Sequence, residues 1–128
     1  MMLTDGMTTL SLPDELDWPD EFSWRPVVQA SEYALDGALI VEHAARLAGR
    51  PITLKSGEEW GFITRAQLEQ LATWGANPAQ ALVLTLRGVA YDVVFRHSET
   101  AIEHEMVLFE GLPIAGDYYR VTLRFLET

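Results

Sequence analysis

Apolar side chains at every second position in the C-terminal half are the feature that most constrains the fold of this chain. Apolar residues fill every second position in three runs, at 82–86, 91–95 and 119–125. Because successive side chains of a strand point to opposite faces of a sheet, this spacing gives each run one face for burial. The Gly88-Val89 pair between the first two runs is typical of a two-residue hairpin turn. The pattern predicts antiparallel strands around a core.

The N-terminal half of the chain carries weaker strand signals. Two runs in this half are expected to be strands, at 27–35 and 52–54, and a further strand is expected in the C-terminal half at 101–109. The segment 38–48 is ambiguous, because its Ala, Leu, Glu and Arg residues favour a helix. It directly follows an Asp-Gly pair at 36–37, which is a tight-turn signal and favours the second strand of a hairpin. We predict a strand for 38–46, with a helix as the alternative.

One main helix is expected at about 64–74. Its first residues, TRAQ, match a capping box, in which the Thr64 hydroxyl accepts from the Gln67 backbone N–H and the Gln67 side chain reaches back. Leu68 and Leu71 lie on one face of this helix and form its buried stripe. A glycine and an Asn-Pro pair follow and end it.

These elements predict an α+β fold, a mainly antiparallel β-sandwich or open barrel of about seven short strands with one main helix. The β-rich α+β domain is expected to span residues 27–128 as a single unit. A length of 128 residues, of which 48% are hydrophobic and 22% charged, is enough for one domain with a hydrophobic core.

Residues 1–26 are predicted to form an extended N-terminal arm instead of a packed element. Three prolines exclude a continuous helix, and five carboxylates alternate with leucine and aromatic residues between 14 and 24. Trp18, Phe22 and Trp24 have little reason to lie in a solvated loop. They either pack along their own domain or dock on another subunit, and we treat them as candidate partner-interface residues.

The charge balance disfavours several kinds of partner. The net charge is −10, and the nine Lys and Arg residues are scattered along the chain, so nucleic acid and anionic membranes are not expected partners. There are no cysteines, which excludes disulfides, zinc–thiolate sites and thiol nucleophiles. No apolar run approaches the roughly 20 residues that cross a bilayer. Residues 1–12 lack the pattern of a signal peptide, so we expect a cytoplasmic origin.

No catalytic, cofactor or metal site is predicted. A phosphate-binding loop needs glycines before its lysine, whereas Lys55 and Ser56 precede Gly57 and the helix begins only at about residue 64. The three histidines show no metal-binding spacing. Ser98 adjoins His97, but neighbouring side chains of a strand point apart. We therefore expect a protein that is not an enzyme.

Two arginines near the C-terminus are the remaining candidates for a partner surface. Arg120 and Arg124 lie on the face of the last strand opposite its apolar residues. If that face is solvated, they can meet carboxylates of a neighbouring copy's arm. The alternative is that they only keep the surface soluble.

The order of elements resembles a known family. An opening LPDELDWPDEFSW is followed by ALDGALIVEHAARLAGRPITL, a WxxITRAQL helix start, an LTLRG hairpin and a YYRVTLRFLE ending. From about residue 12 to 127, this is similar to small proteins of tailed phages and prophages, encoded among tail and baseplate genes. The resemblance implies a distal-tail-like ring or hub subunit of the virion, assembled in the host bacterial cytoplasm. It implies binding to copies of itself and to other tail proteins, and no active site.

Two functions are compatible with the sequence. The first is this phage tail or baseplate subunit, a homo-oligomer without cofactor. The second is a small carbohydrate-binding module that uses Trp60, Trp74 or Trp18 as a stacking platform. Tryptophans buried in the core or covered by a neighbour favour assembly, whereas tryptophans side by side in an open groove favour sugar binding.

Overall fold

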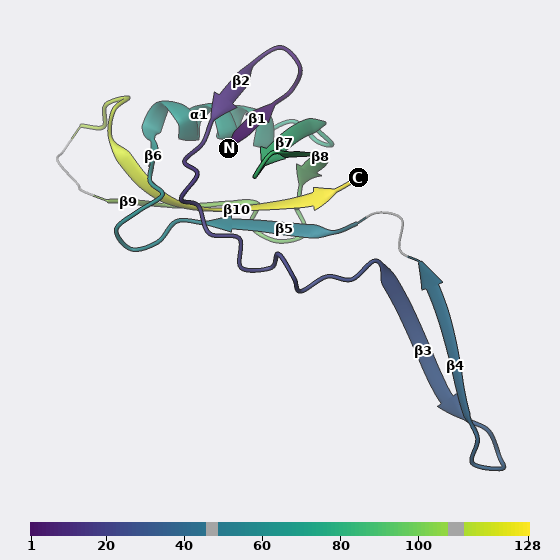
Figure 1. Cartoon of the computed structure of the whole chain (residues 1–128). Helices are drawn as coiled ribbons and strands as arrows, with labels where there is room; N and C mark the ends of the chain where they lie inside the picture. Colours follow the sequence, from purple (N-terminus) through teal and green to yellow (C-terminus); the bar gives the residue numbers. More distant parts are fainter. Residues whose placement is uncertain (46–48, 108–111) are drawn as a thin grey trace.

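The computed structural model describes residues 1–45, 49–107 and 112–128 of the chain. These residues form a curled half-barrel of antiparallel strands, with the helix α1 lying over the sheet (Figure 1). A two-stranded hairpin projects from this body. The predicted α+β fold with a mainly antiparallel, open barrel is confirmed.

The described residues contain ten strands. In chain order the elements are β1 (Met2–Thr4), β2 (Thr9–Ser11), β3 (Val27–Tyr33), β4 (Leu39–Ala45), β5 (Pro51–Lys55), β6 (Ile63–Thr64), α1 (Arg65–Gly75), β7 (Leu82–Leu86), β8 (Val89–Phe95), β9 (Ile102–Met106) and β10 (Tyr118–Glu127). The count exceeds the prediction because β1, β2 and β6 have only two or three residues each, too few to show a periodic pattern.

Strand β10 is the centre of the body. The eight-stranded sheet has the order β2-β1-β7-β8-β10-β5, and β6 and β9 also pair with β10. The residues of β10 that alternation predicted to face inward are buried, and the helix adds Leu68, Leu71 and Trp74 to the same core. The buried inward residues of β10 are Tyr119, Val121, Leu123 and Phe125.

The predicted helix and its cap are confirmed. The Thr64 Oγ1 accepts from the Gln67 N–H at 3.3 Å, and the Gln67 Oε1 accepts from the Thr64 N–H at 2.8 Å. These two bonds satisfy backbone donors that have no partner inside the helix. The helix ends at Gly75, and Ala76 is the C-cap.

The N-terminal segment is part of the body. Strand β1 pairs with β2 on one side and with β7 on the other, and Leu3 is fully buried between them. Leu12 and Leu16 also lie in the core. The expectation of an extended, unpacked arm is therefore wrong for residues 1–18. The loop of this hairpin, residues 5–8, begins with an Asp-Gly pair, which is the signal that could have identified it.

The predicted strand at 38–46 is confirmed as β4, which ends at Ala45, and residues 46–48 lie outside the described part. It pairs along its whole length with β3. Together β3 and β4 form a separate two-stranded sheet that extends away from the body (Figure 1).

Two predicted boundaries need adjustment. The turn between β7 and β8 is Arg87-Gly88, one residue earlier than predicted, and both residues have positive φ, at 51° and 81°. Two positive φ values are typical of the type I′ turn, whose twist matches the flanking strands. The strand predicted at 101–109 is β9, which ends at Met106, and residues 108–111 lie outside the described part.

Candidate functional site

The projecting hairpin β3–β4 has two different faces. Directly paired residues in an antiparallel ribbon point to the same side, so the register assigns each residue to a face. The first, which we call the Tyr33 face, carries no Asp, Glu, Lys or Arg; its residues are Val27, Gln29, Ser31, Tyr33, Leu39, Val41, His43 and Ala45. The opposite face, the Glu42 face, contains the two glutamates of the strands; its described side chains are Ala30, Glu32, Ile40, Glu42 and Ala44.

Large apolar side chains of this hairpin are exposed to solvent. Tyr33 is 76% exposed, Leu39 is 56% exposed, and Leu35 in the connecting turn is fully exposed. The whole of β4 is exposed. A two-stranded hairpin in water is marginally stable when nothing packs on it. The exposed apolar residues therefore form a candidate binding surface.

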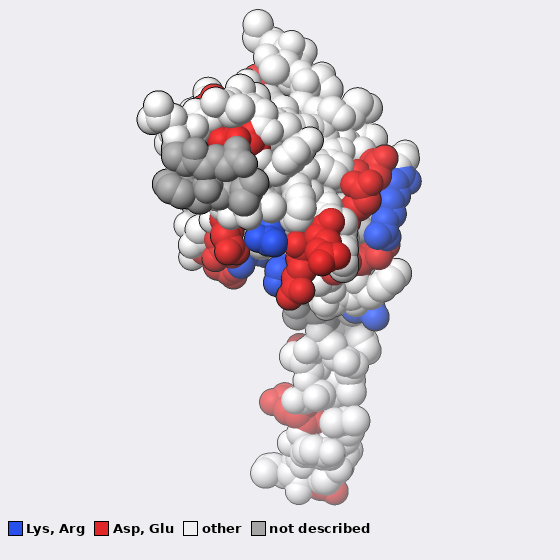
Figure 2. Space-filling model, turned by 90° about the vertical axis from the view of Figure 1, so that its left-hand side faces the viewer, with Lys and Arg blue, Asp and Glu red and all other residues white. Residues whose placement is uncertain are grey.

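The hairpin also carries only negative formal charge. Its carboxylates are Glu32, Asp36 and Glu42, and the sequence from 27 to 45 contains no Lys or Arg. Figure 2 shows the visible side of the hairpin in white and red, without blue. Asp36 also holds the turn, because its Oδ1 accepts from the Ala38 N–H at 2.9 Å.

The segment that leads into the hairpin exposes aromatic and cationic groups. Phe22 is 75% exposed and Trp24 is half-buried, directly before β3. The Arg25 guanidinium binds the backbone carbonyls of Phe22 and Trp24. Among the described residues, no carboxylate forms an ion pair with Arg25. This segment therefore offers a positive charge beside two aromatic rings.

Trp18 lies in the core, which corrects its assignment to a partner interface. It is 6% exposed, with the Arg50 guanidinium 4.8 Å and the Arg87 guanidinium 5.8 Å from its ring centroid. Tyr91 packs edge-on against it, at 5.9 Å between ring centroids. The backbone of the preceding Asp17 bonds to β5 in both directions, which directs the next side chain into the body. The sequence groups Trp18 with Phe22 and Trp24, and no pattern in it separates the buried Trp18 from the other two.

Arg120 and Arg124 lie on the outer face of β10 and bind groups of their own chain. Arg120 donates to the Glu58 carbonyl at 2.9 and 3.2 Å and stacks over the Phe62 ring at 5.4 Å. Arg124 donates to the Thr100 carbonyl at 2.7 Å and to a Glu103 carboxylate oxygen at 3.1 Å. These contacts favour an intrachain role over the predicted contact with a neighbouring copy.

A shallow hollow of about 220 Å³ lies beside Arg120 on the outer face of the sheet. Lys55, Ser56 and His104 are among its lining residues. The Ser56 hydroxyl donates to the Gly61 carbonyl at 2.7 Å and accepts from the Val121 N–H at 3.0 Å. This side chain thus fixes the loop before β6 to β10, and its position in the hollow is explained by packing.

Among the residues that the structure describes, no three His, Asp or Glu side chains lie close enough together to hold a metal ion. Across the same residues, no helix has the length and hydrophobicity to span a bilayer.

The tryptophans named as a possible sugar platform occupy different environments. Trp74 is buried, and its indole N–H donates to Asp5 at 3.2 Å. Trp18 is buried, and Trp60 is exposed, with its ring against Gly57.

Comparisons with family models, with characterised proteins and with solved structures give no match to this chain.

Sequence reasoning did not identify the hairpin as the exposed element. The sequence predicts its two strands and its turn, but it assigns all three to the β-rich domain. The Tyr33 face mixes Gln29, Ser31 and His43 with its apolar residues, so it lacks the uniform apolar stripe of a buried strand. That weak stripe, next to an Asp-Gly turn, is the signal that could have indicated exposure.

Proposed function

We propose that this chain is a structural subunit of a phage or prophage tail or baseplate that acts by binding copies of itself and other tail proteins. The observation that carries the proposal is the β3–β4 hairpin, which leaves the body with its apolar side chains exposed. An assembly subunit has a use for such an element, because a partner covers it in the complex. The phage assignment rests on the family resemblance of the sequence.

The proposal includes no catalytic step, cofactor or metal, and it places the assembled protein in the virion after assembly in the bacterial cytoplasm. Ring assembly uses contacts in which one surface of a copy meets a different surface of the next. A body with a projecting arm supplies two such surfaces. The hairpin, not the segment 1–26, supplies the arm in this proposal.

The tryptophans give less support to carbohydrate binding. A stacking platform needs open aromatic faces, whereas Trp18 and Trp74 are buried and Trp60 is the exposed member of the three candidates. The environments of these residues therefore favour assembly over a sugar-binding module.

Light scattering with size-exclusion chromatography tests self-association. The monomer mass is 14.4 kDa, and we expect the wild type to elute above it, with the mass rising with concentration. Replacing Tyr33, Leu35 and Leu39 together by serine is expected to shift the protein toward monomer. A matched control replaces Met7, which is 95% exposed on the body, by serine and should keep the wild-type mass.

Binding to other tail proteins is tested by mixing the chain with the purified tail proteins of the genome that encodes it. We expect a complex with at least one of them, and the triple serine variant should bind it more weakly. A wild type that stays monomeric at every concentration and forms no such complex would contradict the proposed function.

A further inference from the structure

We propose that the tip of the β3–β4 hairpin, residues 32–38, binds the base of the hairpin, residues 22–25, on a second copy of this chain. This inference rests on the proposed function, and it names the two surfaces that meet. The two ends of the hairpin have complementary chemistry and lie too far apart to meet within one copy.

The tip combines apolar and acidic groups. Tyr33 and Leu35 are its exposed large side chains, and Glu32 and Asp36 are its carboxylates. No cationic residue lies nearby along the hairpin to neutralise these charges. A partner surface that fits the tip must therefore present apolar area and positive charge together.

The base presents that combination. Phe22 is exposed, Trp24 is half-exposed, and Arg25 lies beside them. In the described residues Arg25 binds only backbone carbonyls, so its charge is not neutralised by a carboxylate. Arg50 donates to the Glu21 carbonyl at 2.7 Å. Aromatic and arginine side chains are the residue types enriched where protein partners meet.

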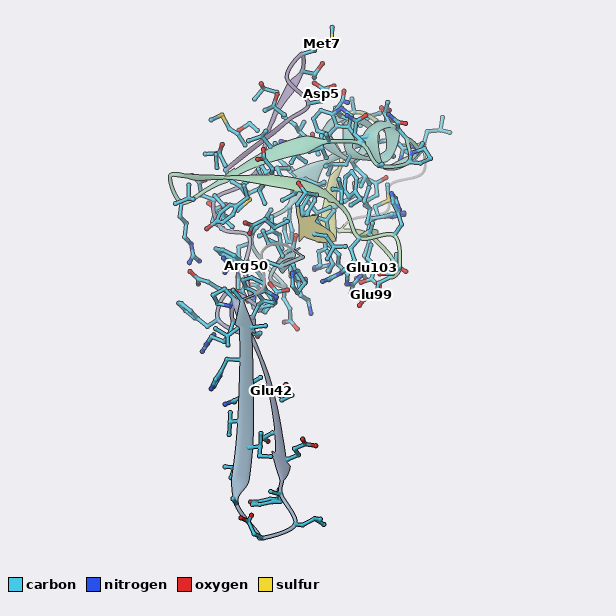
Figure 3. All side chains as sticks on the ribbon, turned by 90° about the vertical axis from the view of Figure 1, so that its right-hand side faces the viewer. Asp5, Met7, Glu42, Arg50, Glu99 and Glu103 are labelled. Carbon is cyan, nitrogen blue, oxygen red and sulfur yellow. The ribbon has the colours of Figure 1, made fainter. Side chains whose placement is uncertain are left out.

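The tip of a copy cannot reach its own base. A strand rises about 3.3 Å per residue, so strands of the length of β3 and β4 hold the two ends about 20 Å apart. Figure 3 shows Arg50 where the hairpin meets the body and Glu42 well along its length. The complementary surface must come from another copy, because paired strands keep the hairpin extended. Both a two-fold pair and a closed ring satisfy this contact.

Charge reversal with a mixing step tests the contact. Glu32→Lys removes the net charge of the tip and leaves Asp36, which the turn needs. Arg25→Glu makes the base repel the tip. Each variant alone is expected to associate about ten-fold more weakly than the wild type. In Glu32→Lys the tip no longer attracts the base, and in Arg25→Glu two acidic surfaces face each other. An equimolar mixture should recover the wild-type mass, because the lysine introduced at the tip of one variant meets the glutamate introduced at the base of the other, and the second contact joins an unchanged tip to an unchanged base.

Cysteine trapping gives a second measurement, because the chain has no native cysteine. Leu35→Cys protein mixed with Phe22→Cys protein is expected to form a disulfide-linked pair on oxidation, visible on a non-reducing gel. The control mixes Leu35→Cys with Met7→Cys and should give far less product, although Met7 on the body is more exposed than Phe22. A circular dichroism spectrum of each variant confirms that it is folded.

The outcomes separate this inference from the proposed function. If both charge variants keep the oligomeric mass of the wild type, and no disulfide forms preferentially between tip and base, the tip-to-base contact is overturned while assembly still stands. A monomeric wild type would overturn the contact and self-association together. Weakening by each variant, recovery on mixing and selective trapping support the contact.

Discussion

Replacing Leu3 by alanine is the sharpest test of the structure, because it distinguishes a packed N-terminus from a solvated arm. Leu3 is fully buried in β1, between β2 and β7. Removing a buried leucine side chain costs about 2–5 kcal/mol, since both the transfer free energy and the contacts around the cavity are lost. A domain of this kind has a total stability of about 5–15 kcal/mol, so the loss is a large fraction of it.

We expect Leu3→Ala to lower the free energy of unfolding by about 2–3 kcal/mol, near the lower end of that range, because the short β1–β2 hairpin can relax around the cavity. That loss corresponds to a fall in melting temperature of roughly 10 °C for a domain of this size. Urea denaturation followed by tryptophan fluorescence measures it as a lower midpoint with an unchanged slope.

The matched control is Met7→Ala, in the loop that joins β1 and β2. Met7 is 95% exposed, so its change should lie within about 0.5 kcal/mol of the wild type. If Leu3→Ala is as stable as Met7→Ala, the N-terminal hairpin does not pack on the sheet and the reasoning fails.

Three smaller effects can be measured with the same denaturation assay. Thr64→Ala removes the helix cap and should cost about 1 kcal/mol, whereas Thr64→Ser should keep most of it; equal losses would contradict the cap. Ser56→Ala leaves the buried Gly61 carbonyl and Val121 N–H without their bonds and should cost about 1–3 kcal/mol, and a neutral result would show that these groups find other partners. The pKa of Asp5 is held below its usual value of 3.8, first by the backbone N–H of Thr8 and next by that of Met7. A carboxyl with a lowered folded-state pKa adds stability that is present above its unfolded-state pKa and lost as the pH falls through the folded-state value. Wild type should therefore lose its stability advantage over Asp5→Asn below about pH 4, and parallel pH profiles of the two proteins would refute this.

The sequence was most informative where a local pattern decides the structure. Alternation along β10 identified its buried face, and the capping box located the start of α1 within one residue. The Asp-Gly pair at 36–37 identified the turn between β3 and β4. For the cap and the turn, the bonds that decide the outcome lie within a few residues along the chain.

The candidate site was harder to predict, because exposure depends on segments far apart in the sequence. Trp18 is buried only because Arg50, Arg87 and Tyr91 come together around it. Arg120 has a partner only because the Glu58 carbonyl lies next to β10. Neither contact has a pattern in the sequence. The hairpin likewise projects because β3 and β4 pair with each other and not with the strands of the eight-stranded sheet.

The lack of Lys and Arg along the hairpin also determines how proteases act on it. Trypsin has no target between Arg25 and Arg46, and proline follows Arg25, a bond that trypsin cuts poorly. Chymotrypsin, in contrast, has Tyr33 and Leu35 in an exposed turn region of the free chain. An assembly that covers the tip should slow chymotryptic cleavage there. Limited digestion with this enzyme is therefore a direct reporter of whether the hairpin is free or covered.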